Sequence, residues 1–399
     1  MPRYTKISAL ALLALLAGAP LGGVDMPTAS AGTRLQAPVP TPPDATQAPI
    51  ALLVDLSSGQ TLFARDAQRR FVPASLTKVM TLFTAFELMQ AGKLTSTQRI
   101  TISPEVGREW GGRGSTLFLQ EGEQVSVDQL LRGIATVSAN DGCIALAEAA
   151  TGSVEAWIGL MNAHARELGM TGSHFGTPNG WMDEGQTFTT AHDLAILGKA
   201  LVERHPQLYQ RYIGHKTLSF EGIAQQNHDP LIGVFDGADG IKTGFTRQAG
   251  YGYLGSAEQN GRRLMMVVAA SPAAPQRAKA ARALMGWGFA AFRSSTLVGE
   301  GQPVAYAKVQ DGAERSVPLV AHQPISLAVA DGFTPDRVQY SLRYEGPLQA
   351  PLTAGQQVAT LDVAVNGAPP FSIPLYAERA VPRANAWQRV RNGVTGIGS

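Results

Sequence analysis

The pattern of apolar residues changes near residue 297, and this change constrains the fold of the 399-residue chain more than any other feature. Before it, helical periodicity alternates with runs that are typical of strands. After it, short segments alternate apolar with polar residues between turn-forming residues, which indicates an all-β fold. We therefore predict an α/β (α+β) domain over 45–296 and a small all-β domain over 297–377.

Helical spacing and strand-like runs define the expected elements of both domains. Helices are predicted at 75–92, 127–134, 143–150, 155–167, 191–202 and 276–292, with strands at 50–55, 61–64, 250–256 and 263–270. In the second domain, strands are predicted at 304–309, 316–320, 325–329, 338–344 and 358–365, and Asn366-Gly367 favours a hairpin turn.

The N-terminus has the pattern of an export signal. Arg3 and Lys6 precede an apolar run at 7–17 that is too short to span a membrane as a helix, and Ala29-Ser30-Ala31 is a cleavage site of the small-x-small kind. We expect residues 1–31 to be removed and 32–44 to form a proline-rich linker; an uncleaved anchor is the alternative. Export indicates a bacterial periplasm or cell surface.

Charge and cysteine content exclude several classes of protein. Lys and Arg total 33 against 31 Asp and Glu, so the chain lacks the strong positive field of a nucleic-acid-binding protein. A single cysteine cannot form an internal disulfide or a cysteine-based zinc site, and no H-E-x-x-H spacing occurs among the 7 histidines. We expect no nucleic-acid partner, no bound metal and no other cofactor.

The first motif that carries chemistry is Ser75-Leu76-Thr77-Lys78, at the start of a predicted helix. Residues three apart share a helical face, so the Lys78 amine can reach the Ser75 hydroxyl. A serine hydroxyl needs a nearby base to act as a nucleophile, and a helix N-terminus offers N–H groups to an oxyanion. Alone the motif is weak, because a capping serine beside a solvated lysine has the same pattern.

Two further motifs follow it. Ser138-Ala139-Asn140 precedes the helix predicted at 143–150, where serine and asparagine are also common helix caps. Lys242-Thr243-Gly244 has a glycine that lets a ligand approach a strand closely, with an ordinary edge strand as the alternative. The order S-x-x-K, S-x-N, K-T-G, with a large helical insert between the first and the last, is far more specific than any single motif.

Together the motifs resemble those of the penicillin-recognising serine acyl transferases. Within that group the chain is similar to low-molecular-mass penicillin-binding proteins, the D-alanyl-D-alanine carboxypeptidases of serine peptidase family S11. The resemblance covers about residues 45–377 and implies a transpeptidase/β-lactamase-like catalytic domain followed by the small C-terminal all-β domain. The stretches that strengthen it are 73–81, 138–147, 239–246 and 250–257.

The resemblance also implies roles for the catalytic residues. Ser75 would be the acylated nucleophile and Lys78 its general base. A lysine acts as a base only when its pKa is lowered, and partial burial and the positive charge of Lys242 would lower that of Lys78. Ser138 would relay a proton to the leaving amine, and Asn140 would hold a substrate amide or carbonyl.

The remaining implied roles concern substrate binding. Thr243, with Lys242 and Gly244 beside it, would bind the terminal carboxylate. The backbone N–H groups of Ser75 and Phe245 would form the oxyanion hole. Related enzymes often have a histidine where Phe245 stands, so we expect a different pocket polarity. Arg277 matches the position of an arginine that binds the carboxylate; the alternative is a helix-start arginine on a solvated face.

Other reactive side chains have structural interpretations. Cys143 has no histidine adjacent in sequence, so we predict a buried packing residue. The histidines at 174, 192, 215 and 228 are expected to be neutral or on the surface. The segment 111–115 contains glycines without the context of a phosphate loop, and we predict a loop near the site.

The tail from 378 to 399 is basic and contains Trp387, Val390 and Val394, which would share a helical face opposite Arg389. Such a helix could lie on a membrane surface, but the segment is short and several glycines weaken it. The sequence therefore leaves open whether the tail attaches to the outer face of the cytoplasmic membrane firmly, weakly or not at all.

The function predicted from these observations is a serine D-alanyl-D-alanine carboxypeptidase that trims the terminal D-Ala from peptidoglycan pentapeptides through an acyl-enzyme and that β-lactams inhibit. The alternatives on the same fold are a D,D-endopeptidase and a β-lactamase, although we find no motif for the deacylating glutamate of class A β-lactamases. A non-catalytic wall-binding protein acting through the β domain is a further alternative, and the intact motifs argue against it.

Overall fold

The computed structural model describes residues 3–7, 42–43, 48–330, 338–365 and 370–388. The chain divides into two compact units, of which one comprises 42–56 and 61–290. The other contains the chain from residue 291 onward, with 57–60 and the described N-terminal residues. The change of pattern near residue 297 lies within strand β11 (Arg293–Val298), a few residues after this division.

The first unit is built on a five-stranded sheet in the order β3 (Gln60–Arg65), β2 (Ile50–Asp55), β10 (Arg262–Ser271), β9 (Gly250–Gln259) and β8 (Ala238–Thr246). The central strand β10 pairs antiparallel with β2 and with β9. Strand β8 pairs antiparallel with β9 and forms one edge of the sheet. The K-T-G motif therefore lies on an edge strand, where a ligand can approach it.

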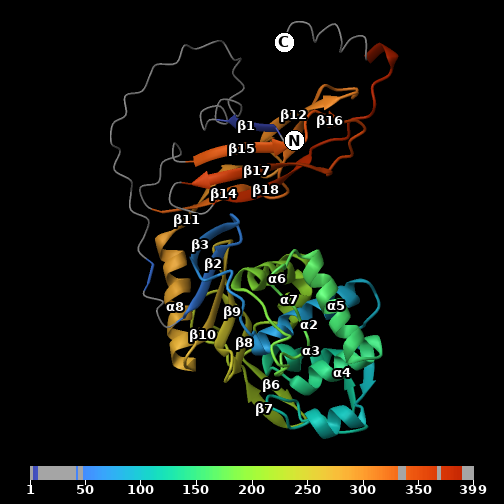
Figure 1. Cartoon of the computed structure of the whole chain (residues 1–399), viewed down its shortest axis with the longest axis vertical. Coiled ribbons are helices and arrows are strands. Elements are labelled where there is room, and N and C mark those ends of the chain that lie inside the picture. Colours follow the sequence, from blue (N-terminus) through green and yellow to red (C-terminus); the bar gives the residue numbers. More distant parts are fainter. Residues whose placement is uncertain (1–2, 8–41, 44–47, 331–337, 366–369, 389–399) are drawn as a thin grey trace. The chain divides into compact units, whose positions relative to one another are not determined.

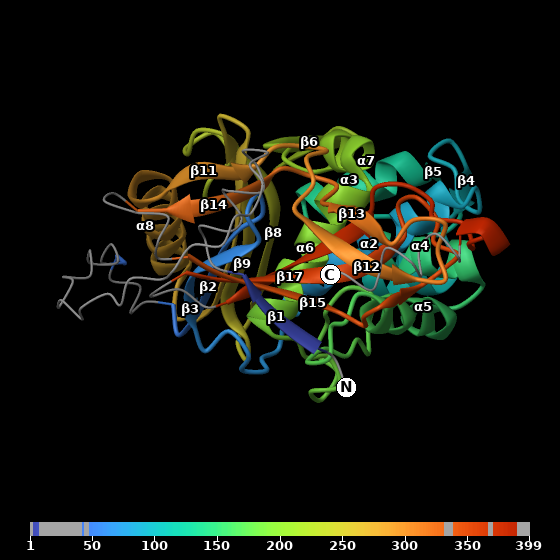
Figure 2. The same ribbon diagram turned by 90° about the horizontal axis from the view of Figure 1, so that it is seen from above.

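Helices cover both faces of this sheet (Figures 1 and 2). On one face, Leu284 of α8 (Ala274–Ala291) shares a buried core with Met266 of β10. On the other face, Val267 of β10 packs in a separate core with the helices at 78–212. These helices are α2 (Lys78–Gln90), α3 (Val127–Thr136), α4 (Asn140–Thr151), α5 (Val154–Glu167), α6 (Ala191–Arg204) and α7 (Pro206–Tyr212). Neighbouring strand residues point to opposite faces, so one strand contributes to two cores.

The predicted helices are all present, with different ends. Helix α4 begins at Asn140, three residues before the predicted start, and no side chain caps it. Instead, the Asn140 N–H donates to the carbonyl oxygen of Ser115 at 2.8 Å, a tertiary bond that local sequence does not show. Helix α7 and two short hairpins were not predicted: β4 (Arg99–Thr101) with β5 (Gln124–Ser126), and β6 (Thr217–Phe220) with β7 (Ile223–Gln226).

The second unit is all β, which confirms the predicted fold class. Its seven-stranded sheet has the order β1 (Arg3–Ile7), β15 (Val338–Tyr344), β17 (Gln357–Val365), β18 (Phe371–Ala377), β13 (Ser316–Val320), β12 (Ala305–Gln310) and β16 (Leu348–Gln349). Strand β11 pairs separately with β14 (Ile325–Val329). Buried and exposed residues alternate along β12, as expected for a sheet with one apolar face.

The ends of the chain lie partly outside the described residues. Residues 3–7 of the predicted export signal form β1, and the rest of the signal lies outside the described residues. The Asn366-Gly367 turn and the residues from 389 onward also lie outside them. The first residues of the predicted tail belong to the β unit, because Val381 forms a bridge with Leu352 and Arg379 pairs with Glu314. In the described part of the chain, no single helix is long and apolar enough to cross a membrane, and only the bent pair α4–α5 passes by length and composition.

Candidate active site

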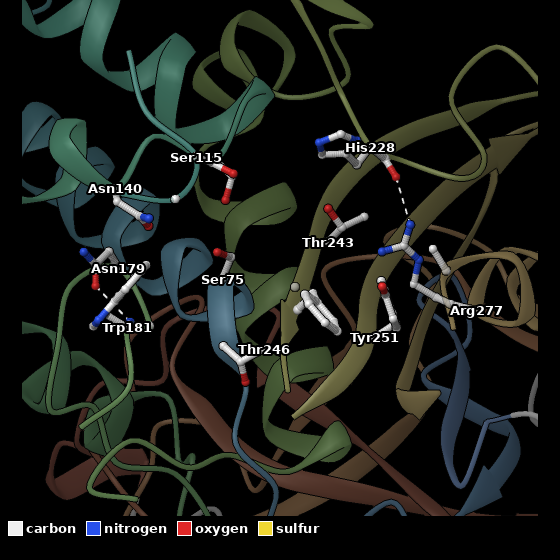
Figure 3. Close-up of a pocket in the computed structure, with 16 residues that line it drawn as sticks. Ser75, Ser115, Asn140, Asn179, Trp181, His228, Thr243, Thr246, Tyr251 and Arg277 are labelled. Carbon is white, nitrogen blue, oxygen red and sulfur yellow. Dashed lines mark hydrogen bonds between the residues drawn. The ribbon is translucent and has the colours of Figure 1, made fainter. Parts of the chain in front are cut away.

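A cavity of about 490 Å³ opens beside β8 in the first unit and brings the three motifs together. Its lining includes Ser75, Ser138, Asn140, Thr243, Gly244, Phe245 and Arg277. Lys78 and Lys242 are buried, with 0% and 4% of their surface exposed. Figure 3 shows Ser75 between Asn140, Asn179 and Trp181 on one side and Thr243, Tyr251 and Arg277 on the other. All nine residues predicted from the sequence thus lie in one region.

Ser75 lies in a 3₁₀ turn, η1 (Ala74–Thr77), which runs directly into α2. The preceding Ala74 has a φ of 50°, a left-handed conformation that is strained for a residue with a Cβ and that is common at functional sites. The turn and the helix place the Lys78 Nζ 2.8 Å from the Ser75 Oγ. The predicted serine–lysine contact is therefore formed.

The Lys78 amine has three neighbours. It donates to the Asn140 Oδ1 at 2.8 Å and to the carbonyl oxygen of Asn179 at 2.6 Å, and its third contact is the Ser75 Oγ. A neutral amine has two N–H bonds and one lone pair. The two carbonyl oxygens can take both N–H bonds, which leaves the lone pair directed at the serine hydroxyl. This geometry suits a base that accepts the Ser75 proton.

Burial makes that neutral state accessible. Removal from water lowers the pKa of Lys78 from 10.5 to about 8, although nearby Cys143 and Asp141 act in the opposite direction. Burial, together with repulsion from Lys78, lowers the pKa of Lys242 to about 7. Lys242 is held through a bond from its Nζ to the Thr243 carbonyl oxygen at 3.1 Å. Burial is thus the main cause of the lowered pKa of Lys78. The prediction from the sequence also included the charge of Lys242 as a cause.

Ser138 lies in the turn between α3 and α4, and Asn140 is the first residue of α4. Ser138 has a φ of 65°, so this motif also contains a strained residue with a Cβ. The Asn140 side chain accepts from Lys78 through Oδ1 and donates through Nδ2 to the Arg113 carbonyl oxygen at 2.8 Å. One Nδ2 hydrogen remains for a substrate carbonyl, which is compatible with the role predicted for Asn140.

The K-T-G strand approaches the Ser75 turn closely. A Cβ built on Gly244 would lie 2.8 Å from the Pro73 carbonyl oxygen and 3.2 Å from the Leu76 nitrogen, so only glycine fits here. The neighbouring Phe245 side chain is 50% exposed and stacks on Tyr251 with ring centroids 4.1 Å apart. The aromatic pair of Phe245 and Tyr251 therefore borders the cavity where related enzymes often have a histidine.

Arg277 lies in the first turn of α8 and is 6% exposed, so the alternative of a solvated arginine is wrong. Its Nη2 donates to the His228 carbonyl oxygen at 3.1 Å, and its guanidinium lies 5.9 Å from the Tyr251 ring. The Nε has no hydrogen-bond partner among the described residues. Burial lowers the pKa of Arg277, but a guanidinium keeps its charge in proteins. A buried cation with an unused N–H at the cavity is suited to bind a carboxylate.

Sequence reasoning missed several residues of the site. Asn179 contributes a backbone oxygen, for which the residue type gives no signal. Asp141 is fully buried, and its carboxylate accepts the backbone N–H groups of Leu117 at 3.0 Å and Leu119 at 3.2 Å, which fixes the segment 117–119 against the start of α4. Its place directly after the S-x-N motif could have revealed it. Trp181 and Tyr251 also line the cavity without any predicted role.

The structure confirms the structural interpretations of Cys143 and of the segment 111–115. Cys143 is buried in the core, and burial raises the pKa of its thiol to about 12, so it is a packing residue. The segment 111–115 reaches the cavity through Gly114 and Ser115, as predicted. His228 is exposed and lines the cavity. Within the described ranges, no group of three or more His, Cys, Asp or Glu is placed to hold a metal ion.

Comparison with known proteins agrees with this arrangement. Residues 36–272 match the peptidase S11 family of D-alanyl-D-alanine carboxypeptidases, and residues 292–383 match the C-terminal domain of penicillin-binding protein 5. The chain is 33% identical over 345 residues to the D-alanyl-D-alanine carboxypeptidase DacA of Escherichia coli (strain K12), covering 85% of each chain. Penicillin-binding protein 5 from Haemophilus influenzae is similar in structure, with a TM-score of 0.74, 32% identity, and coverage of 86% of this chain and 99% of that one.

The fold and the site define a penicillin-binding protein with a serine–lysine centre. More specifically, the chain belongs to the peptidase S11 family, the D-alanyl-D-alanine carboxypeptidases. The resemblance deduced from the three motifs is thereby confirmed.

Proposed function

We propose that the chain is a serine-type D-Ala-D-Ala carboxypeptidase that removes the terminal D-Ala of peptidoglycan pentapeptides through an acyl-enzyme on Ser75. The observation that carries this proposal is the contact of 2.8 Å between the Lys78 Nζ and the Ser75 Oγ at a cavity that also contains Arg277. Family membership supports it, because the relatives that match over 85% of the chain are named D-alanyl-D-alanine carboxypeptidases.

The first half-reaction uses the serine–lysine pair. Lys78 accepts the Ser75 proton while Ser75 attacks the carbonyl carbon between the two D-Ala residues. Backbone N–H groups of Ser75 and Phe245 stabilise the oxyanion. When the C–N bond breaks, the leaving amine of D-Ala takes a proton that Ser138 relays from the lysines. The products are free D-Ala and a peptide esterified to Ser75.

The second half-reaction returns the free enzyme. Water replaces D-Ala as the attacking group, and Lys78 accepts its proton. The tetrahedral adduct collapses with release of the shortened peptide, and the Ser75 oxygen recovers its hydrogen. A β-lactam acylates the same serine by opening its ring, which leaves no departing group to diffuse away. We therefore expect hydrolysis of the β-lactam adduct to be slow, and β-lactams to inhibit.

Comparisons also bear on β-lactam binding and on the alternatives. Penicillin-binding protein D2 from Listeria monocytogenes, in its ampicillin-bound form, is 27% identical to this chain with a TM-score of 0.53. That similarity supports β-lactams as inhibitors of this chain. The names of the matching relatives do not favour a D,D-endopeptidase or a β-lactamase.

The proposed function is tested by D-Ala release from a pentapeptide ending in D-Ala-D-Ala. We expect wild type to release D-Ala and Ser75→Ala to lose at least about 10⁴-fold in rate, because the attacking oxygen is absent. Ser294→Ala serves as a control, since it makes the same exchange at an exposed serine outside the cavity. Release that continues undiminished in Ser75→Ala would contradict the proposal.

Arg277 is expected to determine the preference for a free C-terminus. Arg277→Gln should lower kcat/KM for a peptide with a terminal carboxylate about 10- to 100-fold, the usual loss when a charge-assisted hydrogen bond is removed. The same peptide with a C-terminal amide should be a poor substrate for both the wild type and Arg277→Gln. Arg282→Gln is the control, because Arg282 lies on the same helix but is exposed. Equal losses in both variants would show that Arg277 does not bind the carboxylate.

Acylation by a β-lactam is expected to accelerate as the pH rises through about 8. The pKa of Lys78 is lowered to about 8, so below this pH most molecules carry a protonated Lys78 that cannot accept the Ser75 proton. The rate should then fall about tenfold per pH unit. Stopped-flow measurement between pH 5.5 and 9.5 tests this, and a rate independent of pH over that range would exclude Lys78 as the base.

We also propose that the chain is exported to the periplasm and that its tail attaches weakly to the outer face of the cytoplasmic membrane. The charged and apolar N-terminus supports export, and a substrate in the cell wall requires it. Trp387 is 85% exposed and supports contact of the tail with a membrane surface. Fractionation of cells that produce the protein with or without residues 385–399 tests both points. Export predicts that the protein is found in the periplasm. Attachment predicts a membrane-bound fraction that salt removes and that is lost when the tail is truncated.

A further inference from the structure

A cluster of two tryptophans and one arginine lies beside the cavity. The rings of Trp110 and Trp181 meet edge to face with centroids 5.8 Å apart. The Arg113 guanidinium carbon lies 5.1 Å from the centroid of Trp110 and 5.2 Å from that of Trp181. Arg113 is exposed, and within the described ranges it forms no ion pair with an acidic side chain. The Trp110–Arg113–Trp181 cluster therefore presents a positioned but unneutralised cation.

The cluster lies on the acyl side of the nucleophile. Trp181 lines the cavity, and Figure 3 places it on the side of Ser75 opposite Arg277. Arg113 lies just outside the lining, directly before Gly114, which belongs to it. A Cβ on Gly114 would lie 2.9 Å from the Asn140 Nδ2 and 3.0 Å from the Trp181 ring, so the cluster is packed closely against the S-x-N motif. If Arg277 binds the terminal carboxylate, the remaining residues of the peptide extend from Ser75 towards Trp181.

Both halves of the cluster are also bonded to the groups that hold Lys78. Asn140 accepts from Lys78 and donates to the Arg113 carbonyl oxygen. Asn179 accepts from Lys78 through its backbone oxygen, and its side-chain oxygen accepts the backbone N–H of Trp181 at 3.0 Å. The backbones that carry Arg113 and Trp181 are therefore both hydrogen-bonded to residues that contact the catalytic amine.

We propose that the Trp110–Arg113–Trp181 cluster binds a carboxylate on the side chain of the residue that precedes D-Ala-D-Ala. A guanidinium offers paired N–H donors that match a carboxylate, and stacking on the indoles restricts it before the ligand arrives. The inference rests on the proposed function, because it concerns the part of the peptide that remains on Ser75. It makes the enzyme selective for stem peptides with an acidic third residue over neutral or amidated ones.

The experiment compares two synthetic peptides. Both are Nα-acetyl-L-Lys-D-Ala-D-Ala, with the lysine Nε carrying either a butyryl group or a succinyl group, so that they differ by a carboxylate in place of a terminal methyl group. We expect wild type to prefer the succinyl peptide about tenfold in kcat/KM. Arg113→Gln should reduce the preference to about one, and Arg113→Lys should restore part of it. High salt should weaken the preference in wild type.

The preference is a ratio measured on one enzyme sample, so a general loss of activity or of folded protein cancels. Arg70→Gln is the matched control, because Arg70 is also exposed and also lies over an aromatic ring, 4.6 Å from the centroid of Phe188, which is not part of the cluster. Its preference should equal that of wild type. Equal kcat/KM for both peptides in wild type, or a preference that survives in Arg113→Gln, would overturn the inference. Failure of wild type to release D-Ala from either peptide would instead contradict the proposed function.

Discussion

Replacing Lys78 with arginine is expected to slow the acylation of Ser75 by about 10²- to 10⁴-fold, the range expected for loss of a general base. A guanidinium stays protonated at any accessible pH, so it cannot accept the Ser75 proton. It also does not fit a position with 0% exposure, where the amine already contacts three oxygens. Stopped-flow acylation by a fluorescent penicillin measures the loss.

Two controls separate chemistry from folding in this experiment. Lys93→Arg makes the same substitution at an exposed site just after α2 and should acylate at the wild-type rate. Lys78→Gln removes the base without adding bulk and should lose as much activity as Lys78→Arg. Acylation of Lys78→Gln within tenfold of wild type would mean that another group accepts the proton.

Replacing Gly180 with alanine is expected to disable catalysis, although Gly180 contributes no side chain to the site. Gly180 has a φ of 75°, and a Cβ there would lie 1.9 Å from the Ala74 carbonyl oxygen. The loop must therefore move away from the Ser75 turn and take the Asn179 carbonyl away from Lys78. We expect acylation to fall at least about 100-fold, since an error of 1 Å in catalytic geometry has effects of that size. Unfolding in urea should show that the free energy of unfolding falls by about 2–4 kcal/mol.

Gly185→Ala is the matched control for this change. Gly185 lies in the same loop with a φ of 88°, but no atom lies within 4 Å of a Cβ built there. It should lose about 1–2 kcal/mol of stability from the left-handed conformation alone and keep its acylation rate. If the two variants acylate equally fast, the close approach of Gly180 to Ala74 has no catalytic importance.

The residues with reactive side chains could be predicted from the sequence because their chemistry restricts both residue type and spacing. Ser75 and Lys78 are three residues apart on one helical turn, so their contact follows from local geometry. Lys242 and Asn140 come from distant parts of the chain, and only the resemblance to a known family joined them to the same site. Arg277 was predicted in the same way, and its burial in the structure removes the solvated alternative.

The remaining features depend on tertiary contacts that no local pattern reveals. The start of α4 at Asn140 is fixed by a bond to the Ser115 carbonyl oxygen, so the helix begins before its apolar periodicity does. Asn179 acts through its backbone, and Gly180 through the lack of a side chain. Their importance appears only when the loop that carries them is placed against Ala74.

The central claim is that one serine carries both the peptide and the β-lactam as acyl groups. Mass spectrometry of the full chain after reaction with benzylpenicillin, followed by peptide mapping, tests it most directly. We expect one adduct per chain on Ser75, whose formation blocks D-Ala release from a pentapeptide in the same sample. An adduct on any other residue, or D-Ala release that continues at the wild-type rate from fully acylated protein, would contradict the account.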